Sequence, residues 1–230
     1  MYVWVVLTTF LAMIAAYVLP IRPDMHEKTV VPVAQARVMQ LVVKQRAASQ
    51  YMIERAWPYY DPNGDKSNAY ERKVDYVTGE ITSEMMADYL PIGFIDNTDY
   101  VTALYCMNDD MTELKTGEGS CDKVHDTKIS RMLITYGPIP EKWQNVTLLD
   151  GGGYDIKPSS DMMDAFRTMF SKKDMIGYVI IESGNWYIVN YEGTKYPVPD
   201  LIVNDTGVSD YTLKDCVYDF GTCLAFMSRR

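Results

Sequence analysis

The hydrophobic positions of this chain form one long apolar run, one helical stripe and several short runs rich in β-branched and aromatic residues. The run from Tyr2 to Leu19 contains no charged residue, proline or glycine. Its length is close to what is needed to cross a bilayer core, so it predicts a transmembrane helix. A cleaved signal peptide is the alternative. Against it, no basic residue precedes the run, and its alanines do not have the A-x-A spacing of a cleavage site.

A second helix is predicted from Val33 to Arg55, where helix-forming residues dominate. Val38, Leu41, Val42 and Met52 recur there at helical spacing and form an apolar stripe. The stripe either packs on its own domain, which is the commoner outcome, or forms a seam with a partner helix. These four side chains are therefore candidate interaction residues.

Beyond this helix, short segments separated by turn residues predict a small mixed domain with an antiparallel sheet and a hairpin. Prolines confine the segment YPVPDLIV to an edge strand or a loop. The predicted segments are strands over Tyr100–Met107 and Arg131–Tyr136, a hairpin of IGYVIIES and WYIVNY turning at Gly184-Asn185, and helices over Thr82–Leu90 and after a cap at Ser159 or Ser160.

The expected organisation has three parts. Residues 1–19 form a transmembrane anchor, residues 20–56 a juxtamembrane linker with the amphipathic helix, and residues 57–230 a soluble domain of the α/β (α+β) class. Hydrophobic residues make up 47% and charged residues 23% of the chain, which fits a folded globular domain. The formal net charge of -9 repels phosphate backbones, so nucleic acid is not an expected partner.

The four cysteines are expected to form two disulfides, because they lie in two close pairs as in exported proteins. The predicted pairs are Cys106 with Cys121 and Cys216 with Cys223. Disulfides place the domain in an oxidising compartment. Five basic residues between residues 20 and 46 favour the opposite orientation by the positive-inside rule. The cysteine pattern is given more weight, and free buried thiols are the alternative.

The sequence contains no recognisable catalytic, cofactor or metal-binding motif. His26 and His125 do not lie beside a nucleophile motif, and Gly151–Gly153 is not followed by the Lys-Ser/Thr of a phosphate-binding loop. The segment from Asp61 resembles an EF-hand loop only in part, with Lys66 where glycine is needed and Arg72 at the twelfth position. We therefore expect no enzymatic activity, no cofactor and no metal site.

The order of elements resembles PilM proteins of type IVb thin-pilus systems. The matching segments are the anchor, AQARVMQLVVKQRAASQYM, GEITSEMMADYLPIGF, YVTALYC, and the late helix followed by GYVIIESGNWYIVN and YPVP. This resemblance implies a non-enzymatic, single-pass inner-membrane protein that supports pilus assembly through its periplasmic domain. The implied partners are other pilus assembly proteins, pilins or a second copy of the chain.

Two other functions remain open from the sequence. A minor pilin subunit would carry a basic leader ending in glycine, or a glutamate at position five of the mature chain, where Val5 stands. A membrane-tethered periplasmic enzyme or binding protein could assemble a site from residues that are distant in sequence. A deep cleft with converging carboxylates or a metal site would favour this second alternative.

Overall fold

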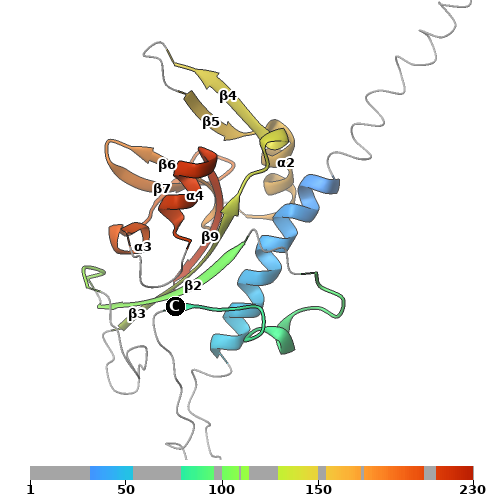
Figure 1. The fold of residues 1–230 in the computed structure, drawn as a ribbon, viewed down its shortest axis with the longest axis vertical. Coiled ribbons are helices and arrows are strands. Elements are labelled where there is room, and N and C mark those ends of the chain that lie inside the picture. Colours follow the sequence, from blue (N-terminus) through green and yellow to red (C-terminus); the bar gives the residue numbers. More distant parts are fainter. Residues whose placement is uncertain are drawn as a thin grey trace, which may run out of the picture.

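The structure, a computed structural model, describes residues 32–53, 79–95, 100–108, 110–113, 129–149, 154–171, 174–204 and 211–229. Within them, a central sheet lies between a long helix on one face and two short helices on the other (Figure 1). A separate two-stranded hairpin projects from this body. The mixed α+β class and the antiparallel sheet expected from the sequence are confirmed.

The central sheet has seven strands in the order β1-β2-β3-β9-β6-β7-β8, and every neighbouring pair is antiparallel. β9 therefore joins two groups of three strands. The strands are β1 (Gly79–Glu80), β2 (Val101–Asn108), β3 (Ile129–Pro138), β6 (Ile176–Glu182), β7 (Asn185–Val189), β8 (Lys195–Pro197) and β9 (Cys223–Arg229).

A helix over residues 32–53 covers one face of this sheet together with α2 (Ser160–Met169). Pro32, the first described residue of the helix, has the fixed φ that suits a first helical position. The opposite face of the sheet is covered by α3 (Asp200–Asn204) and α4 (Leu213–Phe220). Successive strand residues point to opposite faces, so each central strand contributes to both cores.

The apolar stripe of the long helix packs on the protein's own sheet. Val38, Leu41, Val42 and Met52 are all at most 4% exposed. The first three belong to a cluster with α2 residues, and Met52 belongs to a second cluster under β2. Of the two roles considered for the stripe, packing within the domain is the one observed. These side chains are buried and are not a contact surface.

A buried polar network also joins this helix to the sheet. Gln45, which is 2% exposed, donates to the Leu133 carbonyl oxygen (3.1 Å) and to Ser228 Oγ (3.0 Å). Its side-chain oxygen accepts from Thr135 Oγ1 (2.6 Å), and Thr135 also contacts Thr102 Oγ1 (2.9 Å). Buried amides are costly unless hydrogen-bonded, so this network fixes the position of the helix over the sheet.

Most predicted segments of the described chain form as expected, with three corrections. The segment YPVPDLIV begins in the edge strand β8, as expected, but continues from Asp200 as the helix α3 rather than as a loop. The hairpin of β6 and β7 turns at Ser183-Gly184, because Glu182 pairs with Asn185. Both turn residues have positive φ, as a type I′ turn requires. The segment expected to be helical over Thr82–Leu90 forms turns and only a short 3-10 helix, η1 (Ala87–Tyr89).

Other predicted features lie outside the described residues. These are the apolar run 2–19, the histidines and the segment that resembles an EF-hand loop. No helix in the described part of the chain combines the length and hydrophobicity that crossing a bilayer requires.

Candidate functional site

The hairpin of β4 (Gln144–Leu148) and β5 (Tyr154–Pro158) is the first candidate for a functional surface. It forms its own two-stranded sheet and extends away from the body of the domain (Figure 1). Val146 pairs with Ile156 and Leu148 pairs with Tyr154, so these four side chains lie on one face. Val146, Leu148 and Tyr154 are 57%, 67% and 69% exposed. On this apolar hairpin face, these three side chains are open to solvent, whereas Ile156 lies next to Gly221.

The opposite face of the hairpin is polar. Asn145, Thr147, Asp155 and Lys157 alternate with the apolar positions. Lys157 forms an ion pair with Asp155, and this hydrogen bond raises the pKa of the lysine above its ordinary value. The hairpin is therefore amphipathic, and the outer part of its apolar side, formed by Val146, Leu148 and Tyr154, is exposed.

The base of the hairpin is fixed to the domain by buried contacts. Trp143 of η2 (Glu141–Trp143) is 4% exposed, and its carbonyl oxygen accepts from the Ser159 N–H (2.6 Å). Gln144 Nε2 donates to the carbonyl oxygens of Ile139 (2.6 Å) and Phe220 (3.2 Å). A ribbon that is held at its base presents its outer end in a defined direction.

A loop beside η1 carries a second exposed apolar pair. Ile92 and Ile95 are 107% and 82% exposed, the highest exposures among the large hydrophobic side chains of the described chain. The Phe94 N–H donates to the Pro91 carbonyl oxygen (2.9 Å), which closes a tight turn. Gly93 occupies the position with φ of 80°, which glycine adopts readily. This turn holds Ile92 outward. We refer to Ile92 and Ile95 as the isoleucine loop.

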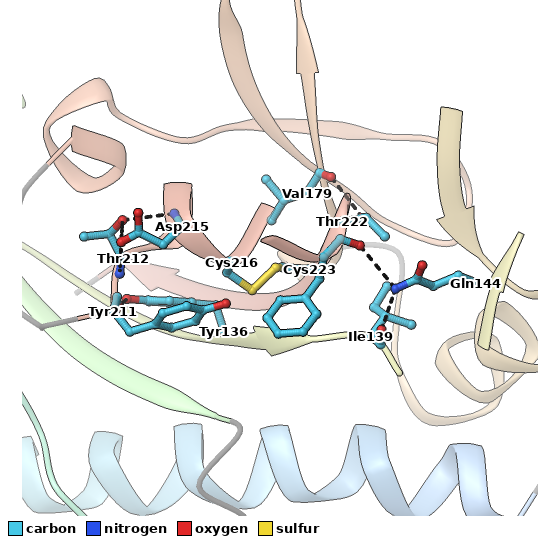
Figure 2. Close-up of a disulfide and its surroundings, with 11 residues drawn as sticks. Tyr136, Ile139, Gln144, Val179, Tyr211, Thr212, Asp215, Cys216, Thr222 and Cys223 are labelled. Atoms are coloured by element: carbon cyan, nitrogen blue, oxygen red, sulfur yellow. Dashed lines mark hydrogen bonds between the residues drawn. A yellow bond between two sulfur atoms is a disulfide. The ribbon is translucent and has the colours of Figure 1, made fainter. Parts of the chain in front are cut away.

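The predicted disulfide between Cys216 and Cys223 is present (Figure 2). Both cysteines are fully buried, and their Cα atoms lie 6.0 Å apart. The bond joins α4 to the start of β9, next to Thr222, whose Oγ1 donates to the Val179 carbonyl oxygen (3.2 Å). The disulfide therefore ties the last helix to the centre of the sheet. Cys106 is also fully buried, in β2, while its predicted partner Cys121 lies outside the described residues.

Hydrogen bonds at the start of α4 stabilise the helix that carries Cys216 (Figure 2). Thr212 and Asp215 form a capping box, in which the Asp215 N–H donates to Thr212 Oγ1 (3.1 Å) and Asp215 Oδ2 accepts from the Thr212 N–H (2.9 Å). Hydrogen bonds from the Thr212 side chain and backbone lower the pKa of Asp215. Burial raises the pKa of the nearby Tyr136 hydroxyl, which donates to the Tyr211 carbonyl oxygen (2.6 Å).

These groups have structural roles, and the described part of the chain brings no three His, Cys, Asp or Glu side chains into a group that could hold a metal ion. Sequence reasoning missed the hairpin face and the isoleucine loop. The alternation of Val146, Leu148, Tyr154 and Ile156 on either side of Gly151–Gly153 was the available signal for the hairpin. The chain matches no known protein-family model, no curated protein and no solved structure.

Proposed function

We propose that this chain is a non-enzymatic accessory protein of type IV pilus assembly, held in the bacterial inner membrane by residues 2–19. Its domain lies in the periplasm and acts through contacts with other pilus assembly proteins or pilins. The family part of this proposal rests on the sequence resemblance to PilM proteins. The structure supplies support for the compartment and for a contact surface.

The observation that carries the proposal is the Cys216–Cys223 disulfide. Disulfides persist in oxidising compartments such as the periplasm and are rare in the reducing cytosol. Both cysteines are buried in the core, and the described residues contain no group of His, Cys, Asp or Glu side chains that could hold a metal ion, so a structural role fits better than a metal-binding one. An apolar N-terminal run together with a structural disulfide fits a tethered, exported domain.

The isoleucine loop supports a role in protein contacts. Ile92 and Ile95 extend from a tight turn at the surface, where two large aliphatic side chains do not contribute to the core. Exposed aliphatic residues on a fixed turn can insert into a pocket of a partner at little cost in conformational entropy. This loop is the contact that we assign to a protein partner.

The proposal is tested by deleting the gene in a bacterium that assembles the pilus and counting pili by electron microscopy. We expect pili to be lost and to be restored by the wild-type gene. Complementation with Ile92→Asp plus Ile95→Asp should fail to restore them, although the variant accumulates in the membrane. Met39→Asp is the matched control, because Met39 is an exposed apolar residue (47%) on the long helix. Normal piliation in the deletion strain would contradict the proposal.

A further inference from the structure

The base of the β4–β5 hairpin lies at the same end of the domain as the start of the long helix. β5 continues through Ser159 directly into α2, so the base of the hairpin and the beginning of α2 are adjacent. Ala34 and Val38 of the long helix share a cluster with Met162 and Phe166 of α2. Figure 1 shows the hairpin extending from α2 away from the body of the domain, with the start of the long helix on the other side of α2. The base of the hairpin therefore lies at the end of the domain where the long helix begins.

The residues that precede the long helix can hold this end of the domain close to a bilayer. If residues 2–19 form the anchor, residues 20–31 connect it to the helix. Fully extended, this connection spans at most about 40 Å, at 3.3–3.6 Å per residue. A five-residue strand extends about 17 Å. A connection of this length allows the domain to lie close to the membrane. The hairpin is then long enough to reach the membrane surface.

The composition of the hairpin face suits the lipid headgroup boundary. The hairpin offers three exposed apolar side chains on a narrow ribbon, two of them at its outer end: Leu148 and Tyr154. Aliphatic side chains beside a tyrosine are suited to the headgroup boundary, where an aromatic ring with a polar tip is favoured.

We propose that the β4–β5 hairpin inserts its apolar face into the interfacial region of the bilayer that holds the anchor. Leu148 and Tyr154 enter the lipid, and Val146 lies at the level of the headgroups. This inference rests on the proposed anchor. The insertion is apolar rather than electrostatic, because the lysine of the hairpin, Lys157, lies on the opposite face and pairs with Asp155. The hairpin gives the domain a second attachment point and fixes its orientation on the membrane.

The test uses the full chain reconstituted in phosphatidylcholine nanodiscs. An environment-sensitive fluorescent amino acid is placed singly at position 148 or 154, and its emission is measured with ordinary and with brominated phosphatidylcholine. Positions 147 and 157 are matched controls, since they lie on the polar face of the same hairpin. Position 7, within the apolar run, reports on the anchor. An unchanged thermal midpoint shows that each labelled chain is folded.

We expect a blue shift and quenching by brominated lipid at positions 148 and 154, and neither at 147 and 157. Quenching should be the same with added anionic lipid or salt. Quenching at position 7 without quenching at 148 and 154 would overturn the inference and leave the anchor intact. Absence of quenching at all positions would overturn both the inference and the anchor. A blue shift at 148 without quenching would show that a second copy covers the hairpin, and would also overturn the inference.

Discussion

Ile156 of the hairpin packs against Gly221, the residue that ends α4. A Cβ atom built on Gly221 would overlap Cδ1 of Ile156, and its φ of 76° places it in the left-handed region. Gly221 therefore meets two requirements: a left-handed helix end and close approach of the hairpin. Through this contact, the hairpin base, α4 and the disulfide form one connected unit.

Gly221→Ala should destabilise the protein by about 2–4 kcal/mol, the sum of left-handed strain of about 1 kcal/mol and overpacking of about 1–3 kcal/mol. Gly193→Ala is the matched control, because its φ is 83° but a Cβ there meets no atom within 4 Å. Thermal unfolding of the full chain in detergent measures both. Equal losses of stability would show that the contact with Ile156 does not matter.

Removing the Cys216–Cys223 disulfide should lower the free energy of unfolding by about 2–3 kcal/mol, because the bond closes a short loop. The double variant Cys216→Ala, Cys223→Ala is compared with the wild type by thermal unfolding. Peptide mapping without reduction should recover Cys216 joined to Cys223 in protein taken from membranes, and Cys106 joined to Cys121. Four free thiols would contradict both the pairing and the periplasmic location.

The capping box should make part of the stability depend on pH. Hydrogen bonds hold the pKa of Asp215 below its unfolded value of about 3.9. The contribution of Asp215 to the free energy of unfolding is therefore present above the unfolded pKa and is lost as the pH falls through the lower folded pKa. Asp215→Asn should lower the melting temperature at about pH 7, and the difference from wild type should shrink below about pH 4. Asp219 is exposed on the same helix, so Asp219→Asn is the control. A difference that does not change with pH would contradict this assignment.

The long helix should behave as part of the core. Leu41 is fully buried, so Leu41→Ala should cost about 2–5 kcal/mol through lost packing and a cavity. Met39→Ala, on the exposed side of the same helix, should change stability by less than about 0.5 kcal/mol. Thermal unfolding in detergent again gives both values. If Leu41→Ala were as mild as Met39→Ala, the helix would not be docked on the sheet.

The orientation of the chain is tested with a reporter fused after Arg230. We expect a reporter that is active only outside the cytoplasm to give signal, and we expect the protein to resist alkaline carbonate extraction. A signal from a cytoplasmic reporter alone would show that the basic residues after the apolar run, rather than the cysteines, determine the orientation. A soluble mature chain beginning near Pro20 would show that the run is a signal peptide.

Sequence patterns predicted the helices and strands whose buried residues recur at the spacing typical of that element. α2 has the expected Ser159 cap, which accepts from the Met162 N–H, and one buried face. β2 is a continuous apolar run, as expected for a strand buried on both faces. β6 and β7 are rich in β-branched and aromatic residues around a glycine turn. In these segments local preference and tertiary packing agree.

Other elements depend on tertiary contacts that the pattern does not record. Three of the four apolar side chains on one face of β4 and β5 are exposed, so their alternation did not indicate a buried face. The turn at Ser183-Gly184 lies one residue earlier than the Gly184-Asn185 pair suggested, because the register places Asn185 opposite Glu182. The segment CLAFM, for which the sequence predicted only the disulfide of Cys223, forms the central strand β9, since β3 and β6 both pair with it.

The position of β9 has a consequence for the order of events during synthesis. Strands β1 to β3 and β6 to β8 are sheet halves that meet only through residues 223–229, which are the last described part of the chain. The two halves cannot pair into one sheet until residues 223–229 have been synthesised and are free to fold. The sheet therefore closes only after the other described strands are available, and the Cys216–Cys223 bond, which also needs residue 223, can form only at this late step.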